Sequence, residues 1–144
     1  MSADTLVRTF DPKQVIVTFG AHIVSGYAEG TFISIERNGD GFEKSRGADG
    51  SIDRINKNAF DYSVTLTIKQ TALSNGVLSA LFSADQLSNN GVLPLSVKDL
   101  SGNSVFVAPQ AWIMNDPSDE YGDTLASREW KFDTGIASKF SGGN

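Results

Sequence analysis

The feature that most constrains the fold is a strict alternation of apolar and polar side chains over residues 61–68, DYSVTLTI. The apolar positions are Tyr62, Val64, Leu66 and Ile68, and the hydroxyl residues Ser63, Thr65 and Thr67 stand between them. Successive side chains of a strand point to opposite faces of a sheet, and β-branched residues favour strands. The pattern therefore predicts a half-buried antiparallel strand with an apolar face on the core and a hydroxyl face toward water.

Shorter segments repeat this period of two and predict further strands over residues 15–19, 22–27, 31–37 and 127–135. Their expected inward sets are Val15, Val17 and Phe19, then Ile23, Ser25 and Tyr27, then Ile33 and Ile35, then Trp130 and Phe132. Residues 92–99 and 104–114 flank the sequence LSGN and predict a hairpin with Gly102 and Asn103 at its tip. Pro94 lies within the first arm, so we expect an edge or a bulge there.

One segment has helical spacing instead. Over residues 74–87, Val77, Leu78, Leu81 and Phe82 recur with the period of a helix, and Ser74 is the expected N-cap. Residues 115–123 predict an exposed acidic loop, and the tail, residues 138–144, is expected to fray. The sum predicts a mainly β fold, an antiparallel β-sandwich or barrel with one flanking α-helix, as a single domain over residues 1–144.

Composition limits the possible partners. The formal net charge of −5 and the pI near 4.7 argue against binding nucleic acid through its phosphates. The absence of cysteine rules out disulfides and thiolate metal sites and suits a cytosolic origin. The first residues, MSADTLVRTFDPKQ, hold no apolar run, so neither a signal peptide nor a membrane span is expected.

No catalytic, cofactor or metal site is expected. His22 is the single histidine and lies in a strand-like stretch, where a structural or solvated role is the commoner one. The glycine-rich residues 38–50 fail the spacing of an EF-hand and of a phosphate loop. We expect their glycines to serve tight turns instead.

The long polar connection over residues 38–60 is the most unusual segment, because loops of this length are commonly functional or disordered. Its apolar side chains argue against disorder. FEKSR and SIDRI can form two arms of a protruding hairpin with GADG at its tip, and the balanced charges suit docking onto a partner such as a second copy. The candidate inter-subunit arm comprises Phe42, Glu43, Lys44, Arg46, Asp49, Ile52, Asp53, Arg54 and Ile55.

The order of these parts resembles the tail tube proteins of contractile-tailed bacteriophages. The likeness begins with FDPKQVIVTFGAHIVSGYAEGTFISIER and continues with FEKSRGADGSIDRINKNAFDYSVTLTIKQTALSNGVLSALFSAD. LPLSVKDLSGNSVFVAPQAWI and REWKFDTG complete it, so it covers nearly the whole chain after the first ten residues. The ordered combination carries the likeness, since no single motif is diagnostic.

The resemblance implies a non-enzymatic structural subunit. Such proteins form homohexameric rings that stack into a hollow tube, with strands of all subunits joined in an inner β-barrel that lets the genome pass without specific binding. It also implies assembly in the host cytoplasm, a place in the virion tail, and the sheath, baseplate hub and tail terminator as partners. Ser63, Thr65 and Thr67 are the candidates for the channel surface. Pyocin and type VI secretion tubes share this architecture and are alternatives.

Two other classes of function stay open from the residues alone. A small β-sandwich that binds carbohydrate would use Trp112, Trp130 and Tyr121 as stacking surfaces, although Trp130 alternates with charged residues as core residues do. A hydrolase would have to use His22 without an evident orienting partner.

Overall fold

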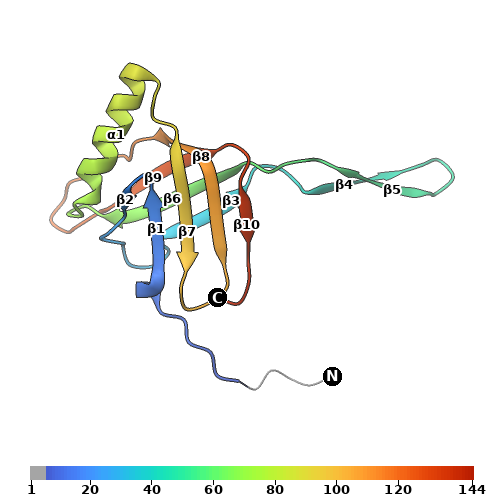
Figure 1. Ribbon diagram of the computed structural model, residues 1–144, viewed down its shortest axis with the longest axis horizontal. Helices are drawn as coiled ribbons and strands as arrows, with labels where there is room; N and C mark the ends of the chain where they lie inside the picture. The colour runs from blue at the N-terminus through green and yellow to red at the C-terminus, as the bar shows by residue number, and fades with distance from the viewer. Residues whose placement is uncertain (1–5) are drawn as a thin grey trace.

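The computed structural model describes residues 6–144, which form one antiparallel β-structure with a single α-helix (Figure 1). The mainly β fold class with one helix is therefore confirmed. The elements in chain order are a 3₁₀ turn Pro12–Gln14, β1 Val15–Phe19, β2 His22–Ile23, β3 Ile33–Arg37, β4 Phe42–Arg46, β5 Ile52–Asn56, β6 Tyr62–Lys69, α1 Ser74–Ser88, β7 Leu93–Asp99, β8 Val105–Asn115, β9 Ser127–Thr134 and β10 Ser138–Phe140.

The main sheet follows the order β2-β1-β7-β8-β9-β6-β3, with β10 attached to β8, and every pairing is antiparallel. Within residues 6–144 the sheet does not close into a barrel, because β2 and β3 remain the two ends of this path. In Figure 1, β1 and β7 cross in front of β6 and β3. The sheet thus folds over on itself into two layers.

β8 is the strand that belongs to both layers. Its first half pairs with β7 and β10, and its second half pairs with β9. The register with β7 shifts between Leu93 and Leu95, opposite Pro109. Pro94 and Pro109 have no N–H to donate to the ladder, and the extra residue of a bulge bends a strand. The bulge expected at Pro94 is confirmed, and it lies where β8 leaves one layer for the other.

The two layers enclose one apolar core. The expected inward faces of β1, β6 and β9 are confirmed, and Leu66, Ile68 and Leu95 are completely buried. Edge-to-face ring contacts join the layers, between Phe19 and Phe132 at 5.1 Å and between the rings of Tyr62 and Phe106 at 5.3 Å. Such pairs add to the burial of apolar area that holds the fold together.

Helix α1 is attached to the core at its start. The buried Asn75 side chain donates to the backbone oxygens of Lys69, Gln70 and Ala72, and its Oδ1 accepts from Trp130 Nε1 at 3.0 Å. The N-cap is Leu73, so the prediction for Ser74 was wrong. Within residues 6–144 no helix is both long and apolar enough to cross a bilayer.

Ser74 has a different role from the expected cap. Its hydroxyl oxygen is buried, accepts the Ser25 N–H at 3.0 Å and lies 2.9 Å from His22 Nε2. The hydroxyl therefore connects β2 and the loop that follows it to the helix, instead of turning back onto the helix N-terminus. His22 is held there as a structural side chain.

The predicted strand over residues 22–27 is also corrected. Only His22–Ile23 pairs with β1, and Val24 rather than Ile23 is buried. The positive φ of Gly26, +79°, turns the chain so that the Tyr27 hydroxyl meets the edge of β1, where it accepts from Val17 N–H and donates to the Val15 oxygen. Burial raises the pKa of this hydroxyl, which therefore remains a donor.

The C-terminal tail is ordered against the fold. Ser138–Phe140 pairs with the first half of β8, and Asn144 Nδ2 donates to the Ser101 oxygen at 2.9 Å. The expectation of a frayed end was therefore wrong. The first half of β8 has an open edge once β9 has separated from it, and β10 supplies the missing backbone partners.

Replacing Leu66 by Asp should unfold the chain, because an unpaired carboxylate buried in the core costs about 3–5 kcal/mol. The control is Thr65→Asp on the opposite face of β6, which lies across from Lys131 and should cost less than about 1 kcal/mol. Urea denaturation followed by circular dichroism compares the two. A Leu66→Asp chain as stable as the control would contradict the assigned face.

Candidate assembly surfaces

The long connection is a hairpin of its own. β4 pairs with β5 in a separate two-stranded sheet that projects from the body (Figure 1), and its tip lies at residues 47–51. The predicted two-arm hairpin with GADG at the tip is confirmed. At its root the Lys57 N–H donates to the Gly41 oxygen at 3.0 Å, and the Arg37 guanidinium donates to the Ala59 oxygen.

The tip is a tight turn held by one carboxylate. Asp49 Oδ1 accepts from the Ser51 hydroxyl at 2.7 Å and from the Ser51 N–H at 3.0 Å, and Gly50 adopts a φ of +87°. These hydrogen bonds lower the pKa of the Asp49 carboxyl. The stability that these hydrogen bonds give to the turn is present at neutral pH, and it is lost as the pH falls through the lowered pKa of Asp49.

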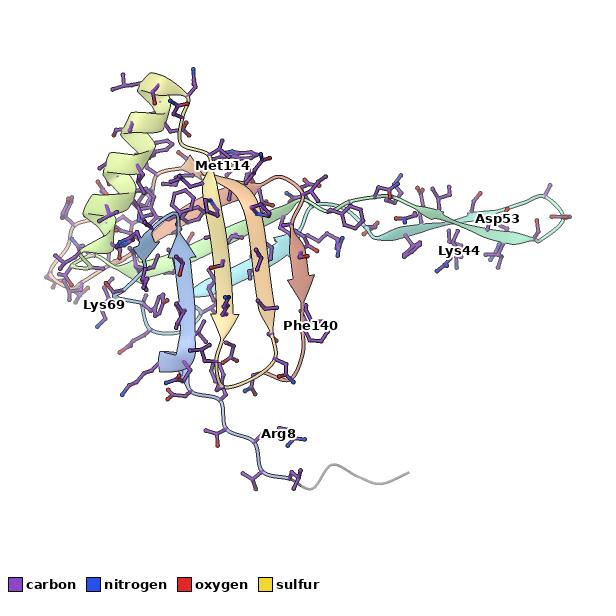
Figure 2. All side chains as sticks on the ribbon, in the orientation of Figure 1. Arg8, Lys44, Asp53, Lys69, Met114 and Phe140 are labelled. Carbon is purple, nitrogen blue, oxygen red and sulfur yellow. The ribbon has the colours of Figure 1, made fainter. Side chains whose placement is uncertain are left out.

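The hairpin register separates the charges into two faces. The basic face comprises Phe42, Lys44, Arg46, Ile52, Arg54 and Asn56, and the acidic face comprises Glu43, Ser45, Asp53 and Ile55. Figure 2 shows Lys44 and Asp53 on opposite sides of the ribbon. Charges that alternate along the sequence are therefore segregated in space, because alternate residues of a strand point to opposite faces.

The basic face is unfavourable for the hairpin by itself. Lys44 lies directly across from Arg54, and like charges at such positions destabilise a strand pair. The Arg54 guanidinium lies 4.6 Å from the centre of the Phe42 ring, which compensates in part. Phe42, Ile52 and Ile55 are 54%, 58% and 48% exposed. A two-stranded hairpin with so little burial is marginally stable at best in water by itself.

The hydroxyl residues of β6 lie on the outer face of the β9–β6–β3 layer. Ser63, Thr65 and Thr67 are half-buried there, and the register places Glu36 and Asp133 beside Ser63, and Glu129 beside Thr67. The sequence alternation identified the three hydroxyls but not their acidic neighbours. Only the strand order brings these carboxylates, which come from distant segments, onto one face.

The layer formed by the second half of β8 with β9, β6 and β3 has two open edges. Within residues 6–144, β3 pairs only with β6, and beyond Ala111 β8 pairs only with β9. The open segments are residues 33–37 on one side and residues 112–115 on the other. Unpaired strand edges are templates for pairing with another chain.

An acidic groove lies at the connection from β8 to β9. It has a volume of about 430 Å³, and its charged lining residues are Asp116, Glu120, Glu129 and Lys131. Asp119 in the same connection forms an ion pair with Arg128, with an Oδ1 to Nε distance of 3.3 Å. The predicted exposed acidic loop is confirmed, and one of its carboxylates is neutralised by the ion pair.

Two of the residues suggested for other functions, Trp130 and His22, have structural positions. Trp130 is 1% exposed, so its ring is not free to stack on a sugar, and Trp112 and Tyr121 lie on β8 and in the acidic connection. His22 contacts Ser74 instead of an acidic residue. Across residues 6–144 no group of three or more His, Asp or Glu side chains is placed to hold a metal ion.

A folded antiparallel sheet with one flanking helix is the mainly β fold that the sequence predicts, and the long early connection forms the hairpin that its residues predict. The family model of the bacteriophage PhiTE tail tube protein matches residues 13–142. The chain belongs to this family of phage tail tube proteins. It is therefore a structural, non-enzymatic component of a virion tail.

The tail tube protein is also similar to individual proteins of known sequence or structure. Structural protein ORF10 of Pseudomonas phage KPP10 is 28% identical over 130 residues, which span 85% of this chain and 75% of that protein. A chain of the tube-terminating cap of the anti-feeding prophage has a TM-score of 0.66 at 12% identity. The match covers 97% of this chain and 96% of that chain.

Two further structures share the fold of the tube protein. A chain of the PVC extracellular contractile injection system, from its extended sheath–tube complex, has a TM-score of 0.65 at 13% identity over 97% of this chain and 99% of that chain. A chain of the native gene transfer agent virion has a TM-score of 0.63 at 13% identity, and the match covers 92% of this chain and 100% of that chain. At these identities the likeness shows a common fold.

Replacing Lys44 by Glu should stabilise the hairpin of dilute tube protein by about 0.5–1 kcal/mol, because a like-charge pair with Arg54 becomes an attractive one. Amide hydrogen exchange of β4 and β5 measures the change. Lys44→Ala, which only removes the repulsion, should give a smaller gain. Faster exchange in Lys44→Glu than in the native chain would contradict the assigned register.

Proposed function

We propose that the chain assembles into homohexameric rings that stack into the hollow tube of a phage tail, through which the genome passes during ejection. The family supports a tube subunit. The observation that carries the ring is the layer of β8, β9, β6 and β3, which presents an open edge on each side. An interface between two different edges of neighbouring copies is head-to-tail, and such interfaces generate rings when the rotation closes.

The strand directions favour this closure. β8, β9, β6 and β3 alternate in direction, so β3 runs opposite to β8. When copies are related by rotation about the tube axis, β3 of one copy meets an antiparallel β8 of the next. The layers then join into one continuous antiparallel barrel, which removes both open edges.

The position of the hairpin supports a contact between successive rings. β3 and β6 lead into it at the end of the layer where Arg37 lies across from Tyr62. The acidic connection joins the opposite end, where Lys69 lies across from Ser127. If the edges of the layer join copies within a ring, the ends of its strands face the rings above and below. The hairpin then acts as the inter-subunit arm between rings.

The outer face of the same layer supplies the channel surface in this arrangement. Ser63, Thr65 and Thr67 would line the channel together with the carboxylates of Glu36, Glu129 and Asp133 and the ammonium of Lys131. A hydroxyl-rich surface with a net negative charge repels phosphates, so DNA slides through without binding.

Further partners follow from the tail tube family. A sheath would surround the tube, and a baseplate hub and a tail terminator would meet its two ends. Two solved structures with this fold come from a sheath–tube complex and a sheath/tube terminator of a contractile injection system. The family match to a phage protein favours a phage tail over a pyocin or a type VI secretion system.

Removal of the hairpin should leave the fold intact and abolish stacking. Lys57 N–H already donates to the Gly41 oxygen, so a two-residue Asn-Gly turn can replace Phe42–Asn56. Negative-stain microscopy should show tubes of uniform width for the native chain and only single rings or dispersed subunits for the trimmed chain. Circular dichroism and thermal melting control for folding.

Two results would contradict the proposal in different ways. Tubes formed by the trimmed chain would show that the hairpin is not the contact between rings. A native chain that remains monomeric at all concentrations and salt conditions would contradict the tube itself.

The channel surface is tested with a single cysteine, since the chain has none of its own. A gold cluster attached at Thr65→Cys should appear on the axis of assembled tubes in electron micrographs. The comparison label, at the exposed Ser79→Cys on helix α1, should lie at the outer wall. Thr65 labels at the outer wall would exclude this face from the channel.

A further inference from the structure

We infer that the basic face of the hairpin docks into the acidic groove between β8 and β9 of a copy in the next ring. This inference rests on the proposed stacking of rings. It names the two surfaces that meet between one ring and the next. The occupant of the groove is a second copy of the chain, and the recognition is electrostatic. Lys44, Arg46 and Arg54 meet Asp116, Glu120 and Glu129.

Within residues 6–144 no carboxylate forms an ion pair with the cations of the basic face. These three cations lie on one side of a hairpin that projects from the body (Figure 1). The register places Lys44 directly across from Arg54. By contrast, the acidic face has an internal partner, because Lys57 Nζ donates to Glu43 Oε2 at 3.1 Å. The unneutralised charge of the hairpin is therefore concentrated on the basic face, and a surface of opposite charge would relieve it.

The acidic groove has the complementary charge. Three carboxylates and one ammonium, that of Lys131, line a groove of about 430 Å³, and the face of Pro117 contributes an apolar wall. The basic face likewise carries two exposed apolar side chains, Phe42 and Ile52, beside its cations. Interfaces commonly combine an apolar contact with surrounding charged pairs in this way.

The two surfaces lie where stacked copies would bring them together. The hairpin leaves the β9–β6–β3 layer at the Tyr62 end of β6 (Figure 1). The residues that line the groove lie at the other end, where Lys69 pairs with Ser127. Because the two surfaces lie at opposite ends of the layer, the hairpin of one copy cannot reach the groove of the same copy. The contact is head-to-tail, and it repeats without limit along a stack.

The test reverses the charges on each side separately. An arm variant carries Lys44→Glu and Arg54→Glu, and a groove variant carries Asp116→Lys and Glu120→Lys. At the lowest protein concentration at which the native chain forms tubes, neither variant alone should form them, because the concentration that each needs for assembly is raised by about tenfold or more. An equimolar mixture should form tubes, because reversed arms fit reversed grooves and native arms fit native grooves.

The control is Lys13→Glu with Lys98→Glu, which changes the net charge as the arm variant does but at exposed positions of the body. It should assemble like the native chain. Tubes from either variant alone at the assembly concentration of the native chain, or no tubes from the mixture, would overturn the docking while leaving the tube intact. If the native chain forms no tubes, the proposed function fails, and the docking fails with it.

Discussion

The bend of β8 at Pro109 is the constraint on which the rest of the structure depends. One continuous strand serves two layers, so the partners of its first half cannot follow it into the second. The first half is completed by β10, whereas no strand of the described residues 6–144 covers the edge of the second half beyond Ala111. The same bend that encloses the core therefore creates an edge that a neighbour can pair with.

The sequence predicted the elements that depend on local alternation. The core faces of β1, β6 and β9 followed from a period of two, and the bulge followed from Pro94, because these features are written in adjacent residues. The errors lay where a distant segment decides the outcome. Ser74 bonds to β2 and the loop that follows it instead of capping its own helix, and the C-terminal residues order because β8 needs a partner.

The candidate surfaces also divide into those set by neighbouring residues and those set by distant segments. The hairpin was predictable from its residues, and its two charged faces follow once the register is known. The acidic groove and the open edges were not, because they depend on which strands lie side by side. Charges that alternate in the sequence lie on opposite faces of the hairpin, because successive side chains of a strand point to opposite sides. A count of opposite charges therefore does not describe the charge of either face.

The location of the hairpin and the groove at opposite ends of one layer has a consequence for growth. In a stack held by this contact, one terminal ring displays unoccupied hairpins and the other displays unoccupied grooves. The two ends are chemically different, so a protein that starts the tube and a protein that stops it cannot use the same surface. A starter with groove-like acidic sites and a stopper with a basic projection, or the reverse pair, would give the tube a fixed direction of elongation.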